Sequence, residues 1–198
     1  MNLANKLTIF RIVLVPLMII VTFFGWPGEF LGIPTMAWIL NLIFIIASIT
    51  DKLDGYIARS RNQVTTFGKF LDPIADKVLV ITAMIILVEM GRLPAWIPTI
   101  IVFREFIVSG YRLIAVENGG KVIAASIWGK LKTVTQMIAI IIAFIDNNAF
   151  GAVFSGTLTG FPLVINILTT LMMSVCVIAT IFSGWNYIKN GKDLLKDK

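Results

Sequence analysis

The sequence predicts an all-α membrane protein with six transmembrane helices and with both termini in the cytoplasm. Of its 198 residues, 58% are hydrophobic and only 14% are charged, whereas a soluble domain averages about 25% charged residues. Apolar runs of roughly 20 residues, the length that spans a bilayer, recur along the whole chain. Basic residues gather at one end of these runs, and this asymmetry orients them.

The expected spans cover about residues 7–25, 36–59, 67–90, 95–117, 125–146 and 162–188. Short polar or Gly/Pro stretches separate them, so we expect residues 1–198 to form a single integral-membrane domain. The first run follows Lys6 and includes Arg11, as in a signal peptide, but residues 25–28 do not resemble a cleavage site. We therefore expect this run to be retained as the first helix.

The placement of charge predicts the orientation of these spans. All but one of the 17 Lys and Arg residues fall at one side of the membrane; the exception, Arg92, lies with Glu29, Glu89 and Asp146 at the other. By the positive-inside rule, the basic side and both termini face the cytoplasm. The net charge of +6 is then concentrated on a face that can adhere to anionic headgroups. No soluble basic module is present to bind nucleic acid.

Four aspartates lie where the second run ends and the third begins: Asp51, Asp54, Asp72 and Asp76. Spacings of three and four residues place each pair on one helix face. Ionised side chains in apolar segments are costly and usually functional, and like charges this close repel unless a cation or a proton intervenes. A loop of about seven residues joins the two runs, so all four carboxylates can converge at the cytoplasmic side.

These carboxylates predict a divalent-metal site. Hard oxygen ligands suit Mg²⁺ or Mn²⁺, and two such ions would clamp a diphosphate. Zinc is excluded in practice, because the chain has no histidine and its one cysteine, Cys176, is expected only to pack in the last run. Without histidine the general base must be a carboxylate, a lysine or water, and Asp76, deepest along the third run, is the best candidate. The alternative is a structural network of ion pairs between the aspartates and Lys52, Arg59, Lys69 and Lys77.

Small residues accompany the aspartates. Gly55, Ala58 and Gly68 remove side-chain bulk on the same helix faces, which would let a flat ligand approach the backbone. Close packing of helices through small residues is the alternative.

The two segments Asp51-x-x-Asp54-Gly55-x-x-Ala58-Arg59 and Gly68-x-x-x-Asp72-x-x-x-Asp76 resemble the signature of the CDP-alcohol phosphatidyltransferase family. The resemblance implies a CDP-alcohol phosphotransferase-type bundle of six membrane helices, with a dinuclear metal site open to the cytoplasm. Such enzymes displace CMP from a CDP-linked lipid by attack of an alcohol on the phosphorus nearer the lipid. A homodimer is also implied.

The resemblance implies roles for individual residues. Asp51, Asp54 and Asp72 would be metal ligands, and Asp76 would be both a ligand and the general base. The residues implied to contact the CDP-lipid are Gly55, Ala58, Arg59 and Gly68.

Segments outside the signature indicate the acceptor. Residues 5–11, 104–106, 111–112 and 126–136 resemble the bacterial members that use glycerol 3-phosphate. The implied reaction, a step of phospholipid biosynthesis, transfers the phosphatidyl group of CDP-diacylglycerol to glycerol 3-phosphate and gives phosphatidylglycerol phosphate and CMP.

A dianionic acceptor near four carboxylates needs additional cations. Arginine can grip a phosphate through two hydrogen bonds, and the cations placed for this are Arg104, Arg112, Lys130 and Lys132. For Arg104 the alternative is a structural salt bridge with Glu105 or Glu117.

Other functions remain open at this point. A related enzyme could use inositol phosphate or serine as its acceptor. A proton- or metal-coupled transporter would be expected to show internal repeats and broken helices near mid-bilayer. No repeat is visible, and the acidic residues cluster at one face instead of crossing the membrane. A purely structural scaffold would leave the four aspartates unexplained.

Overall fold

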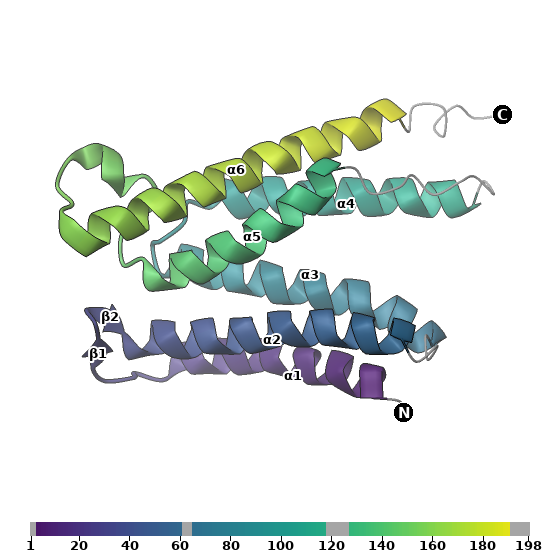
Figure 1. Ribbon diagram of the computed structural model, residues 1–198, viewed down its shortest axis with the longest axis horizontal. Coiled ribbons are helices and arrows are strands. Elements are labelled where there is room, and N and C mark those ends of the chain that lie inside the picture. Colours follow the sequence, from purple (N-terminus) through teal and green to yellow (C-terminus); the bar gives the residue numbers. More distant parts are fainter. Residues whose placement is uncertain (1–2, 61–64, 118–126, 191–198) are drawn as a thin grey trace.

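The computed structural model describes residues 3–60, 65–117 and 127–190, which form a bundle of six helices (Figure 1). The helices are α1 (Leu3–Phe23), α2 (Thr35–Ser60), α3 (Thr66–Glu89), α4 (Trp96–Glu117), α5 (Ile127–Ile145) and α6 (Gly160–Asn190). Each agrees with one expected run to within a few residues, so the prediction of an all-α chain is confirmed.

The bundle has two groups of helices. In one group α1 packs on α2 and α3, and in the other α6 packs on α5 and α4, while α2 and α5 join the groups (Figure 1). Consecutive helices α3 and α4 touch each other only slightly. The beginning of α1 and the end of α6 lie at the same end of the bundle.

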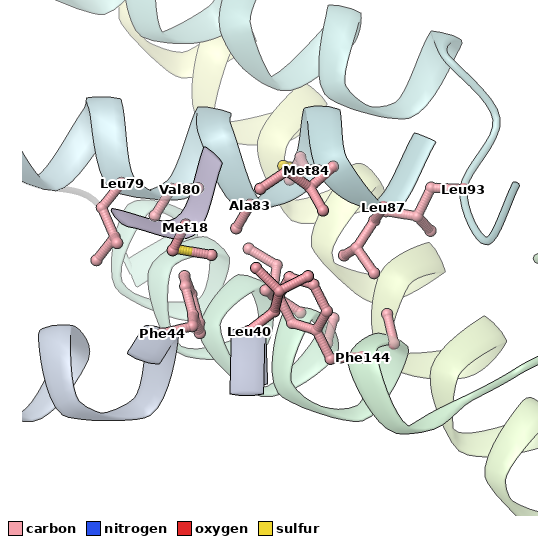
Figure 2. Close-up of a cluster of buried hydrophobic side chains, with 14 of the residues drawn as sticks. Met18, Leu40, Phe44, Leu79, Val80, Ala83, Met84, Leu87, Leu93 and Phe144 are labelled. Atoms are coloured by element: carbon pink, nitrogen blue, oxygen red, sulfur yellow. The ribbon is translucent and has the colours of Figure 1, made fainter. Parts of the chain in front are cut away.

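A core of apolar side chains fills the space between the two groups. Met18, Leu40, Phe44, Met84 and Phe144 come from four helices and are fully buried (Figure 2). Cys176, expected only to pack, is buried in the same cluster. Burial of this kind holds helices together through close packing and dispersion.

The outward faces of the helices are apolar as well. Large exposed side chains include Phe10, Leu42, Ile85, Phe106 and Leu171, and soluble proteins rarely expose contiguous surfaces of this kind. Within the described part of the chain, four helices, α1, α2, α5 and α6, are long and apolar enough to cross a membrane. Helices α3 and α4 are not among them, because they carry most of the charged residues discussed below.

A short hairpin was not predicted. Strands β1 (Glu29–Phe30) and β2 (Ile33–Pro34) pair antiparallel at the end of the bundle opposite the start of α1 (Figure 1). Their two-residue turn has positive φ angles at Leu31 (57°) and Gly32 (74°), as in a type I′ turn. Leucine is an unusual residue at such a position, so the sequence lacks the Asn-Gly or Asp-Gly signal that normally indicates this hairpin.

Arg92, the one basic residue predicted to lie on the opposite side of the membrane from the others, is buried at this same end. Arg92, in the turn between α3 and α4, donates to the carbonyl oxygens of Ala143 and Phe144 and to Oδ1 of Asn147, the last at 2.6 Å. Burial lowers the pKa of Arg92 to about 10, so the guanidinium remains charged at neutral pH. Asn147 in turn donates to the carbonyl of Gly32. The loops at this end are therefore tied together.

Candidate active site

Three of the four aspartates gather against one face of α1. Nη1 of Arg11 lies 2.8 Å from Oδ1 of Asp51, and its Nη2 lies 2.5 Å from Oδ2 of Asp54. The hydroxyl of Thr8 donates to Oδ1 of Asp72 at 2.7 Å and lies 3.4 Å from Oδ2 of Asp54. Thr8 and Arg11 are three residues apart, hence on one helix face. The end of α2 and the beginning of α3 thus lie together against α1. The spacing of the aspartates predicted that α2 and α3 would meet, but it did not predict the part played by α1.

The beginning of α3 is fixed by a local cap and by contact with α1. The side chain of Thr65 accepts a hydrogen bond from the backbone N–H of Gly68 at 3.0 Å, which is the usual N-cap arrangement. Thr65 also donates to Oδ1 of Asn5 at 2.9 Å. A Cβ atom on Gly68 would lie only 3.2 Å from that Asn5 oxygen and 3.3 Å from the Thr65 hydroxyl. Close packing therefore explains the glycine here.

Asp76 lies between this cluster and a second group of charges. It is near enough to interact electrostatically with Asp51 and Arg11 of this cluster, and with Lys132 and Glu105 of the second group. Asp76 is half-buried and lines a cavity of about 630 Å³ that α3, α4, α5 and α6 enclose. The other three aspartates do not line that cavity: Asp51, Asp54 and Asp72.

The cavity contains all the cations that were predicted to bind the acceptor phosphate: Arg104, Arg112, Lys130 and Lys132. Lys77 lines it as well and donates to Oγ of Ser109 at 2.5 Å, which joins α3 to α4. The cavity therefore has five cationic and two acidic side chains, and an anionic ligand suits this balance. Sequence reasoning considered Lys77 only as an ion-pair partner, because its neighbours on α4 are distant in the chain.

Glu105 holds two of these cations in place. Its Oε1 accepts from Nζ of Lys132 at 2.6 Å and from Nη1 of Arg104 at 2.9 Å. Nη2 of Arg104 also donates to Oγ of Ser183 on α6, at 2.5 Å. The salt bridge considered for Arg104 therefore exists with Glu105, while the same arginine still lines the cavity. The side chain of Glu117 lies outside the described part of the structure.

Other predicted residues are only partly visible. The side chains of Ala58, Arg59 and Lys69 lie outside the described residues, so their proposed roles stay predictions. Gly55 is half-buried on α2. The ion pairs of Asp51 and Asp54 in the described structure are with Arg11, which the alternative network did not include.

The donor set determines which metal this site could hold. The four carboxylates and the Thr8 hydroxyl provide only oxygen donors, and these fit Mg²⁺ or Mn²⁺. Among the described residues, no group of three acidic, histidine or cysteine side chains is arranged so that it could hold a metal ion. Arg11 instead forms ion pairs with both Asp51 and Asp54, and its single positive charge offsets one of their two negative charges.

Comparison with known proteins adds a further finding. A sequence model of the family described as "CDP-alcohol phosphatidyltransferase" matches residues 1–185. A "CDP-diacylglycerol--glycerol-3-phosphate 3-phosphatidyltransferase" of Bacillus subtilis (strain 168) is 42% identical over 200 residues, covering 98% of this chain and 97% of the relative. A protein of the same description from Haemophilus influenzae is 38% identical, covering 99% and 96%. A "Probable phosphatidylglycerophosphate synthase" of Mycobacterium tuberculosis is 37% identical, covering 94% and 80%.

Proposed function

Because this chain belongs to the CDP-alcohol phosphatidyltransferase family, we propose that it transfers the phosphatidyl group of CDP-diacylglycerol to glycerol 3-phosphate. The products are phosphatidylglycerol phosphate and CMP. The observation that carries the proposal is the position of Asp76, which lies between the aspartate cluster and the basic cavity. A base in that position can serve a liponucleotide on one side and a phosphorylated alcohol on the other.

In the proposed reaction Asp76 accepts the proton of the attacking hydroxyl of glycerol 3-phosphate. The hydroxyl oxygen forms a bond to the phosphorus nearer the lipid, the bond from that phosphorus to the CMP oxygen breaks, and CMP leaves with the electron pair. The cavity cations hold the acceptor's phosphate during this step: Arg104, Arg112, Lys130 and Lys132. Charge-assisted contacts of this kind position the acceptor for in-line attack.

The residues proposed to hold two divalent ions are Asp51, Asp54, Asp72 and Asp76. Bound Mg²⁺ or Mn²⁺ would neutralise the diphosphate and stabilise the leaving group. Thr8 orients the Asp72 carboxylate, and Arg11 pairs with Asp51 and Asp54, which offsets one of their two negative charges. Gly55, Ala58 and Arg59 are proposed to border the CDP-lipid, together with Gly68, whose small size also serves its packing against Asn5.

The proposed topology is a single domain of residues 1–198 with six spans, in which the two termini and the cavity face the cytoplasm of a cell membrane. The location of the beginning of α1 and the end of α6 at one end of the bundle supports this topology. Five charged side chains of α3 and α4 line the cavity, which gives them a polar surrounding away from lipid: Asp76, Lys77, Arg104, Glu105 and Arg112. Association as a homodimer is part of the proposal.

The lipid substrate also needs an apolar path. A second cavity, of about 450 Å³, lies between α3 and α4, and its wall is almost entirely apolar. Ile81 lines both this cavity and the basic one. We expect an acyl chain of CDP-diacylglycerol to occupy the apolar cavity while the headgroup reaches the aspartates.

A test of acceptor specificity decides the proposal. The purified protein, in detergent with Mg²⁺ or Mn²⁺ and CDP-diacylglycerol, is given glycerol 3-phosphate, inositol phosphate or serine. Release of CMP only with glycerol 3-phosphate is expected. Rapid release with either other acceptor, and none with glycerol 3-phosphate, would reject the assigned acceptor but keep the reaction class.

A further inference from the structure

Tyr187 on α6 lies against both arginines of the basic cavity. Its ring centroid is 5.8 Å from Cζ of Arg104 and 5.7 Å from Cζ of Arg112. Its hydroxyl accepts a hydrogen bond from Nη2 of Arg112 at 3.0 Å. The tyrosine is only 2% exposed and lines the cavity. One buried ring therefore contacts two guanidinium groups through cation–π interactions.

The two arginines depend on this ring to different degrees. Arg104 is also held by Glu105 and Ser183, so its position has independent support. Arg112 is exposed near the end of α4, and its contacts in the described structure are with Tyr187. A long arginine side chain loses considerable conformational entropy when it is held in one position. The ring and hydroxyl of Tyr187 offset that cost in advance of ligand binding.

We propose that Tyr187 is a positioning residue that turns Arg112 toward Arg104 and so makes a paired arginine site for a phosphate monoester dianion. The inference rests on the proposed function, because the ligand is the phosphate of the acceptor. In this role Tyr187 helps the enzyme to select a phosphorylated acceptor over an unphosphorylated one, although the tyrosine need not contact the substrate. Two guanidinium groups that are already held in position before binding bind a dianion more tightly than two mobile ones.

Substitutions at Tyr187 separate this role from a packing role. In Tyr187→Leu both cation–π contacts and the hydroxyl are lost, and we expect the KM for glycerol 3-phosphate to rise about tenfold. The KM for CDP-diacylglycerol should stay within about twofold. Tyr187→Phe keeps the ring and loses only the hydroxyl, so its effect should be intermediate, about threefold.

Trp185 provides a matched control, since it is an aromatic residue of the same helix that is exposed on the outer surface. Trp185→Leu should leave both KM values unchanged. Equal increases of the two KM values in Tyr187→Leu, or a fall in kcat alone, would show that Tyr187 only packs and would overturn the proposal.

Binding of inorganic phosphate to the purified protein, measured by calorimetry, tests the arginine pair without turnover. Weaker binding in Tyr187→Leu than in the wild type supports the pair, and equal binding overturns it. If the wild type released no CMP with glycerol 3-phosphate, the proposed reaction would fail. The phosphate measurement would still decide the role of Tyr187.

Discussion

The hydroxyl of Thr8 lies 2.7 Å from a carboxylate oxygen of Asp72, 64 residues further along the chain. This contact makes α1 a third wall of the aspartate site, beside the two helices that carry the carboxylates. It also means that a neutral side chain orients the Asp72 carboxylate.

Replacing Thr8 by valine should therefore reduce turnover without unfolding the protein. Valine keeps the shape but removes the donor to Asp72, and a hydrogen bond to a charged group contributes about 1.5–3 kcal/mol. We expect a fall in kcat of about tenfold or more, and a higher concentration of Mg²⁺ for half-maximal rate. Thr8→Ser, which keeps the hydroxyl, is the control and should remain close to the wild type. Equal rates and metal requirements in the valine variant would contradict the role of Thr8.

Asp76→Asn should abolish most of the turnover. The amide cannot accept the acceptor's proton, and general base catalysis typically contributes about 10²–10⁴-fold. CMP release under saturating substrates measures the loss, and the thermal unfolding midpoint checks that the fold is intact. Glu29→Gln, at an exposed carboxylate in the hairpin at the opposite end, should leave the rate unchanged. A fully active Asp76→Asn variant would move the base role to another group.

Glu105 joins Lys132 and Arg104, so its removal should destabilise the fold. Glu105→Gln leaves two largely buried cations without their shared carboxylate, and breaking a buried ion pair in this way costs about 3–5 kcal/mol. The free energy of unfolding in detergent should fall by an amount of that order. In the double variant Glu105→Gln/Lys132→Met, part of the loss should be recovered, because one unpaired charge is gone. Additive losses in this double-mutant cycle would show that the two residues are not coupled.

Much of the site follows from local spacing, and the rest depends on tertiary contacts. The intervals between Asp51 and Asp54, and between Asp72 and Asp76, place each pair on one helix face, so these residues could be identified from the sequence. The side chain of Tyr187 could not, because an aromatic residue in an apolar run has the same pattern whether it faces lipid or a cavity. Only the packing of α6 on α4 places Tyr187 beside Arg112.

The helices themselves were predictable because apolar runs of spanning length have few alternatives in a membrane. The sequence left two reasons for glycine at position 68, the approach of a ligand and close packing of helices. The nearness of Asn5 shows that close packing already favours glycine there. In the sequence Arg11 was considered for a signal peptide, for orientation and for the family resemblance, and not as a partner of the aspartates. A buried cation in an apolar run needs an acidic partner, and in the structure Asp51 and Asp54 are the partners of Arg11.

The last prediction concerns the far end of the bundle, where Arg92 should support stability and not chemistry. The guanidinium is buried and binds the carbonyls of Ala143 and Phe144 together with Oδ1 of Asn147. Arg92→Met would leave these acceptors unsatisfied, at a cost of about 1–3 kcal/mol for each group. We expect a clear decrease in the unfolding midpoint, whereas kcat of the folded fraction should be unchanged because the active site lies at the other end. Arg92→Lys keeps the charge but lacks the planar guanidinium that reaches three acceptors. Its unfolding midpoint should therefore fall between those of the wild type and Arg92→Met. An Arg92→Met variant with normal stability and reduced kcat would instead place Arg92 in the path of catalysis.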